Sequence, residues 1–237
     1  MKKIFLILGI GLLALIIVIS IAVGLYIGPI VKMGIEQVGP KVTQVPVLLD
    51  GVDLALGTGS VTLKGLTVGN PQGYSAAQAF KAGTIAVSLV AQSVLSDKIV
   101  VHAIHVESPE ITYEGGLGGN NLSKILSNVN TFIKNNIPQS DKPAPKIEVD
   151  DFLMTGAIVH VNVSGLVSKD IPLPQIHLTD LGKDGNGITP AELTRAVLKV
   201  ISVDTVTAVA SSAGGIGKLG GNISQQITSG LSGLLGK

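Results

Sequence analysis

The chain has 237 residues, and its 17 basic and 16 acidic residues leave a formal net charge of +1 at pH 7. With no Trp, three Tyr and four Phe, it offers neither a basic surface for phosphates nor aromatic platforms for bases, which argues against nucleic-acid binding. The absence of cysteine excludes disulfides, thiolate metal sites and cysteine nucleophiles.

A long apolar segment follows Met1-Lys2-Lys3. No charged residue occurs from Ile4 to Val31, and about 20 apolar residues suffice for a helix to cross a bilayer. We therefore predict a signal-anchor transmembrane helix within residues 1–31, with the two lysines keeping the N-terminus in the cytoplasm and the rest exported. The alternative is a cleaved signal peptide, because Ser20-Ile21-Ala22 has small residues at cleavage-like spacing.

A short stalk is expected over residues 31–44, and after it the sequence changes to β-branched segments separated by Gly, Asn and Pro. The loops between these segments are short, which favours antiparallel pairing, because parallel neighbours need a crossover of about a dozen residues. The expected strands are Val47–Leu56, Ser60–Val68, Thr84–Val90, Ile99–Glu107, Ile111–Glu114, Lys146–Met154, Ala157–Val163 and Ile171–Leu178.

Two of these strands differ in how apolar and polar residues alternate along them. Thr84–Val90 places Ile85, Val87 and Leu89 on one side and small or polar residues on the other, which indicates one buried face. Ile99–Glu107 has apolar residues on both sides, so we expect both of its faces to be covered.

Two helices are predicted after the first strands. The first contains apolar residues at helical spacing, with Asn121 or Ser123 near its N-cap: Leu122, Ile125, Leu126, Val129, Phe132 and Ile133. A proline-containing linker, residues 135–145, follows it. The second helix runs from Thr189 to about Val203, because Thr189, Pro190 and Glu192 combine a capping box with a proline at the first helical position.

The last segment, residues 211–237, is rich in Gly and Ser but carries an apolar residue every three or four positions from Ile216 to Leu234. This spacing indicates an amphipathic helix that lies on the membrane or on the sheet. Its glycines disfavour a helix, so a disordered tail is the alternative.

Four patterns in the sequence bear on metal binding, acid–base catalysis or nucleotide binding. His102 and His105 lie three apart on a strand and should project to opposite faces, so they cannot share a metal ion. Asp150 and Asp151 should diverge for the same reason. The segment Asp184-Gly185-Asn186-Gly187-Ile188 lacks the leading Asp and the spacing of a calcium loop, which indicates a turn. The glycines of 115–119 match no nucleotide motif. The sequence therefore predicts no catalytic, cofactor-binding or metal-binding residues, and no enzyme.

One ordered series of turns and strands is more specific than a general β pattern. Its segments are Leu49-Asp50-Gly51-Val52, Gly59 to Tyr74 with Asn70-Pro71-Gln72-Gly73, Phe80 to Val87, Ile99 to Ile111 with Ser108-Pro109, and Gly119-Asn120-Asn121-Leu122. This series, which covers roughly residues 45–135, resembles the N-terminal module of AsmA-like proteins of the bacterial envelope, in a short member.

The resemblance implies an α+β fold that is mainly β. An elongated, curved antiparallel sheet with two packing helices would follow the anchor, and residues 146–205 would continue the sheet and add the second helix. It also implies an inner-membrane protein with its bulk in the periplasm, which binds or hands on lipid in cell-envelope and outer-membrane biogenesis.

The AsmA-type resemblance supplies no catalytic residues. Phospholipid and envelope proteins are the expected partners beside the membrane itself. The alternative function is a structural module that tethers envelope proteins without binding lipid. Acyl chains would contact one face of the strands, for which the candidates are Ile85, Val87, Leu89, Val101 and Ile104.

Overall fold

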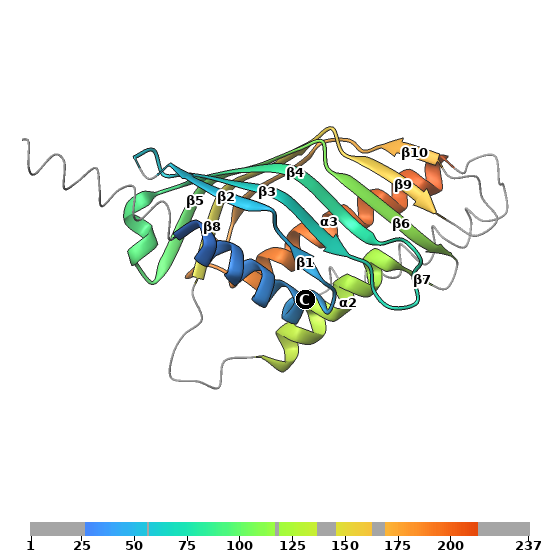
Figure 1. Cartoon of the computed structure of the whole chain (residues 1–237), viewed down its shortest axis with the longest axis horizontal. Coiled ribbons are helices and arrows are strands. Elements are labelled where there is room, and N and C mark those ends of the chain that lie inside the picture. The colour runs from blue at the N-terminus through green and yellow to red at the C-terminus, as the bar shows by residue number, and fades with distance from the viewer. Residues whose placement is uncertain (1–26, 56, 117–118, 137–145, 163–168, 213–237) are drawn as a thin grey trace, which may run out of the picture.

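One curved β-sheet organises the part of the chain that the structure describes, residues 27–55, 57–116, 119–136, 146–162 and 169–212. In this computed structural model the sheet arches over three α-helices, namely residues 27–43, α2 (Asn121–Asn135) and α3 (Pro190–Ser212) (Figure 1). The strands are β1 (Val47–Leu48), β2 (Gly51–Ala55), β3 (Ser60–Gly69), β4 (Gln78–Leu89), β5 (Lys98–Glu107), β6 (Glu110–Gly116), β7 (Gly119–Asn120), β8 (Lys146–Thr155), β9 (Ile158–Asn162), β10 (Lys169–Pro172) and β11 (Ile176–Leu181).

The sheet consists largely of long strands that are interrupted part-way. β5 and β6 lie end to end, antiparallel to β4, and are separated only by Ser108 and Pro109. β8 and β9 lie end to end beside them, and β11 and β10 pair antiparallel to β8 and β9 at one edge. On the other side of β4, β3 pairs with it and in turn carries β1 and β2. Strands from both expected segments, 45–135 and 146–205, therefore share one sheet.

The expectation of a purely antiparallel sheet is wrong, because the sheet is mixed. β8 runs parallel to β5, with Lys98 opposite Lys146, and β9 runs parallel to β6, with Glu110 opposite Ile158. Paired residues are separated by the same number of positions in both cases. The long strand made of β8 and β9 therefore stays in register with the one made of β5 and β6 along its whole length. The connection from β6 to β8 contains α2 and is long enough for the crossover that parallel pairing requires.

A β-bulge in β5 changes which side chains face the helices. Ser88 and Leu89 are neighbours on β4, but they pair with Ala103 and Val101, so His102 is the extra residue. The extra residue reverses the alternation, and as a result Val101 and Val106 are both buried under the arch. His102 and His105 are instead both exposed. The predictions that these histidines point to opposite faces and that both faces of this strand are covered are therefore wrong.

The two predicted helices are present, and a third is added. The capping box of α3 is confirmed: Glu192 Oε2 accepts hydrogen bonds from the Thr189 N–H at 2.8 Å and hydroxyl at 2.9 Å. These bonds, the backbone one above all, lower the pKa of Glu192. α3 continues to Ser212, beyond its expected end. The Asn120 side chain caps α2 by accepting from the Ser123 N–H at 2.8 Å, in place of the two residues expected.

Three local expectations were wrong in detail. Residues 27–43 are helical rather than a stalk, with Pro40 in the last turn. The strand expected at Val47–Leu56 divides into β1 and β2, and the strand expected at Ile171–Leu178 divides into β10 and β11. In the second case Leu173 donates its N–H to Ala157 O at 2.9 Å, outside the regular pairing.

The two ends of the chain bear on the expected membrane contacts. No helix within the described residues combines the length and the apolar character needed to span a bilayer. The anchor expected over residues 1–31 falls mainly on residues 1–26, which lie outside the described part. The expected tail, 211–237, is likewise outside it apart from the last two residues of α3.

Candidate functional site

An apolar cavity of about 520 Å³ lies beneath the arch, between the sheet and the helices. This volume is within the range of roughly 300–1,000 Å³ that is typical of ligand pockets. Strands β3, β4, β5, β6 and β8 line it from one side. Residues 27–43, α2 and α3 line it from the other side, α3 through Leu193, Val197, Leu198 and Ile201 at helical spacing.

The lining of this inner cavity carries no charged side chain among the described residues. Thr43 and Thr194 are its only polar side chains there, and both bond within their own helices. Thr43 Oγ1 donates to Gly39 O at 2.8 Å, and Thr194 Oγ1 donates to Pro190 O at 2.9 Å. The cavity thus suits the apolar body of a ligand, and it offers no free polar group to anchor a polar one.

A second apolar cavity, of about 430 Å³, adjoins the first. Three side chains line both cavities: Ile35 from helix 27–43, Leu63 from β3 and Val87 from β4. The outer cavity is further lined by Ile27 and Val31, by the hairpin between β2 and β3, and by the 3₁₀ helix η1 (Ala91–Leu95). Both cavities are partly open to solvent.

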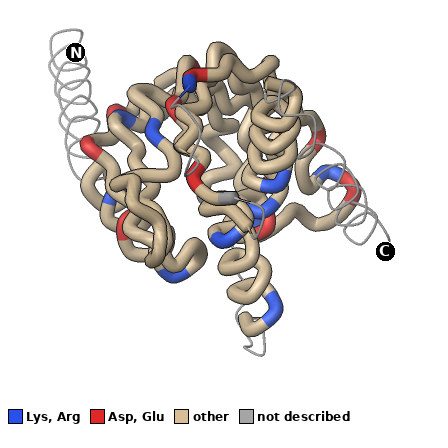
Figure 2. Tube along the Cα trace, turned by 90° about the vertical axis from the view of Figure 1, so that its right-hand side faces the viewer, with Lys and Arg blue, Asp and Glu red and all other residues tan. Residues whose placement is uncertain are grey.

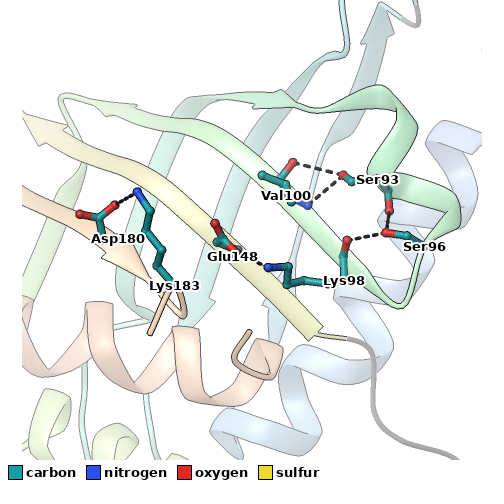
Figure 3. Close-up of polar contacts among 7 residues, drawn as sticks. All are labelled: Ser93, Ser96, Lys98, Val100, Glu148, Asp180 and Lys183. Atoms are coloured by element: carbon teal, nitrogen blue, oxygen red, sulfur yellow. Dashed lines mark hydrogen bonds and ion pairs between the residues drawn. The ribbon is translucent and has the colours of Figure 1, made fainter. Parts of the chain in front are cut away.

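Serine side chains hold η1 in place beside the outer cavity. The Ser93 hydroxyl donates to Val90 O at 2.7 Å and accepts from the Val100 N–H of β5 at 2.8 Å. The Ser96 hydroxyl lies 2.7 Å from Ser93 O and 2.6 Å from Lys98 O. Figure 3 shows this chain of contacts running from η1 to β5. It fixes the rim of the outer cavity against the sheet.

Helix 27–43 is held closely against β1 and β2. Glu36 Oε1 accepts from the Leu49 N–H at 3.0 Å, and Lys32 Nζ lies 3.6 Å from the same carboxylate and donates to the Leu49 carbonyl. A side chain at Gly39 would collide with Val47, since an added Cβ would lie 2.9 Å from it. This close approach places Ile35 between the two cavities.

The structure places four of the five predicted lipid-contact residues on the cavity linings. Ile85 and Ile104 line the inner cavity, Leu89 lines the outer one, and Val87 lines both. Val101 is buried in the core and lines neither cavity. The sequence reasoning missed the helical contributions. The spacing of Leu193, Val197, Leu198 and Ile201 could have indicated them, whereas nothing local marks Ile35 as a cavity residue.

The outer face of the sheet carries polar pairs instead. His102 Nδ1 lies 3.0 Å from Asp150 Oδ2, and Asp151 contacts His105 at 3.5 Å and His177 at 2.6 Å. The hydrogen bond with His177 is the main cause that lowers the pKa of Asp151. Asp150 and Asp151 therefore both reach histidines on this face, contrary to the expected divergence. No group of three or more His, Asp or Glu in the described residues is arranged to hold a metal ion.

Ion pairs also occur elsewhere on the described surface. Lys98 pairs with Glu148 between β5 and β8, and Lys183 pairs with Asp180 at 2.7 Å (Figure 3). Figure 2 shows acidic and basic residues interspersed along the described trace. Within the segment 184–188, residues 184–186 form a turn, as predicted, and Ile188 bridges to Ile147. The inner and outer cavities are therefore the strongest candidate site.

Two residues behind the AsmA-type resemblance, Asn70 and Asn121, belong to one polar network at the far end of the sheet. Glu114 accepts from Asn70 Nδ2 at 3.1 Å, from the Ser75 hydroxyl at 2.7 Å and from the Ala76 N–H at 2.8 Å. Asn121 in turn bonds Asn70. The network joins the turn after β3, the end of β6 and the start of α2, and so it fixes α2 beneath the inner cavity.

The comparisons leave the family open: the sequence matches no protein-family model and no curated protein.

Proposed function

We propose that this protein is a membrane-anchored, AsmA-like protein of the cell envelope that binds or hands on lipid without catalysing a reaction. The observation that carries the proposal is the pair of adjoining cavities with linings that are almost wholly apolar. Ligand pockets usually combine an apolar lining with a few converging polar groups. Here the described lining of the inner cavity has only two threonines, whose hydroxyls are already bonded, so the matching ligand is an apolar chain.

The location follows from the sequence. The apolar segment of residues 4–31 predicts a single-pass anchor, with the sheet on the exported side, in the periplasm. Helix 27–43 continues from that segment and contributes Ile27 and Val31 to the outer cavity. The cavity would therefore open close to the bilayer, where lipid is available. Six long strands side by side at ~4.8 Å spacing span far less than an envelope, so one copy would act near the membrane.

Photo-crosslinking of the full chain in cells tests this proposal. A photoreactive amino acid is placed at Ile104, which lines the inner cavity, or at the adjacent His105, which is exposed on the other face of β5. We expect lipid adducts from position 104 and none from position 105. A second pair, Val87 and Ser88, repeats the comparison on β4.

Two results would contradict the proposal. Equal lipid labelling from both faces would indicate only general proximity to the membrane. Protein adducts without lipid adducts would favour the alternative function, a structural module that tethers envelope proteins.

A further inference from the structure

The two cavities differ in how exposed their walls are. The outer cavity is bounded by exposed residues: Val94 of η1 has 47% of its surface exposed, and Ala55, Ser60 and Ala91 are also exposed. The inner cavity ends against residues with almost no exposure, since Ile111 is 0% exposed and Leu122 and Met154 are each 1% exposed. Both cavities are partly open to solvent, but the outer one is lined by Ile27 and Val31, which lie next to the predicted anchor. We therefore take the η1 end, beside the membrane, as the end where a lipid chain enters.

We propose that the inner and outer cavities form one channel that takes a single linear acyl chain tail-first. The polar headgroup stays outside, and Ile35, Leu63 and Val87 form a constriction that limits how far the chain enters. The inference rests on the proposed function, and it adds the class of ligand, the direction of entry and the residues that set chain-length preference.

Polarity determines which end of the ligand leads. Burying a charged or hydrogen-bonding headgroup without partners is costly, and the threonines of the inner cavity already bond within their own helices. In the outer cavity Ser60 lies at the β2–β3 hairpin, where its hydroxyl accepts from Thr58 at 3.1 Å. The one polar side chain in the described lining of the outer cavity is thus at the entrance, and it is already bonded to Thr58. Selection should depend on the acyl chain and only slightly on the headgroup.

The wall between the two cavities determines how a chain would run through them. The two volumes, about 520 and 430 Å³, each lie within the range that is typical of ligand pockets. Ile35, Leu63 and Val87 come from three different elements and line both volumes, so a chain that extends from the outer cavity into the inner one must pass them. A larger side chain at this constriction should close the inner cavity and leave the outer one open.

The test measures binding of saturated fatty acids of increasing length to the purified full chain and to Val87→Phe. A matched control, His105→Phe, adds an aromatic ring on the exposed face of the sheet. For the wild type and the control, affinity should rise with chain length. Val87→Phe should keep its affinity for short acids and lose at least about tenfold for long ones, the loss expected when about two methylenes remain in water.

A second arm compares a fatty acid, a fatty alcohol and a lysophosphatidylcholine with the same chain. Their affinities should agree within about threefold; affinity that follows headgroup charge would overturn the inference.

Two other results would also overturn the inference. One is a dependence of affinity on chain length that is unchanged or uniformly lowered in Val87→Phe. The other is crosslinking from the channel to residues 213–237, which would make that segment the occupant. If Val87→Phe does not fold, Leu63→Phe replaces it. A wild type that binds no probe refutes the proposed function itself, whereas lipid binding with no change of profile refutes only the channel.

Discussion

Asn121 donates a hydrogen bond from its side-chain amide to the side-chain oxygen of Asn70, 2.8 Å away and 51 positions earlier in the chain. The same amide donates to Thr112 O at 2.7 Å, and the Asn121 side-chain oxygen accepts from the Glu114 N–H at 3.0 Å. Asn121 is fully buried, so one side chain ties the first turn of α2 to β6 and to the turn after β3. This bond positions Leu122 and Ile125 under the inner cavity.

Replacing Asn121 with alanine should destabilise the protein strongly. The change would leave the Glu114 N–H, the Thr112 carbonyl and the side-chain oxygen of Asn70 without their partner in a partly buried environment. Unsatisfied buried groups cost about 1–3 kcal/mol, so we expect a loss of about 2–3 kcal/mol in the free energy of unfolding. Urea denaturation of the full chain, followed by circular dichroism, measures it. Asn135→Ala, at an exposed site near the end of the same helix, should change it by less than about 0.5 kcal/mol. Equal effects at the two sites would contradict the role of the network.

The carboxylate of Glu114 should make stability depend on pH. Burial raises the pKa of Glu114, but hydrogen bonds from Ser75, Ala76 and Asn70 outweigh it and hold the pKa below its ordinary value of 4.5. A carboxylate whose pKa is depressed on folding stabilises the protein above its unfolded pKa. That contribution is lost as the pH falls through the folded pKa.

Glu114→Gln isolates this contribution. Between pH 7 and pH 5 the stability difference between wild type and variant should stay constant, and below about pH 4.5 it should shrink as the wild-type carboxylate is protonated. Denaturant midpoints over this pH range provide the measurement. The exposed Glu107→Gln serves as the control and should follow the wild type. A difference that grows on acidification would refute this assignment.

Gly65 should be intolerant of any side chain. Its φ is +63°, and an added Cβ would lie 1.9 Å from Asp50 Oδ2, at the point where β1 and β2 are interrupted opposite β3. Gly65→Ala should therefore lower the free energy of unfolding by about 2 kcal/mol, through backbone strain and displacement of Asp50. Gly83→Ala, on the adjacent strand with no atom within 4 Å of its added Cβ, should be nearly neutral. Thermal unfolding of the two variants distinguishes them, and equal melting temperatures would show that the strain is absorbed.

Part of this fold is encoded locally, and those predictions were confirmed. The β-branched segments 60–68 and 146–154, bounded by breaker residues, predicted β3 and β8. The capping box formed by Thr189 and Glu192 correctly predicted that α3 begins at Pro190. The Asn-Pro-x-Gly turn and the Asn-Leu helix start were recognised as a pattern, although only the structure shows that Asn70 and Asn121 bond each other. The anchor and the tail stay predictions from sequence.

The tertiary structure decided how the strands of the sheet pair with one another and which cavities the sheet encloses. The parallel register of β5 with β8 joins residues 48 positions apart, and the bulge at His102 depends on the pairing of β5 with its neighbours. That bulge turned Val101 and Val106 to the same side and moved two histidines to the other. The channel arises only when Ile35 of a helix meets Leu63 and Val87 of two strands. Local sequence specifies the preference of each segment for helix or strand. A cavity is a space between segments, and its walls are set by packing that no single segment contains.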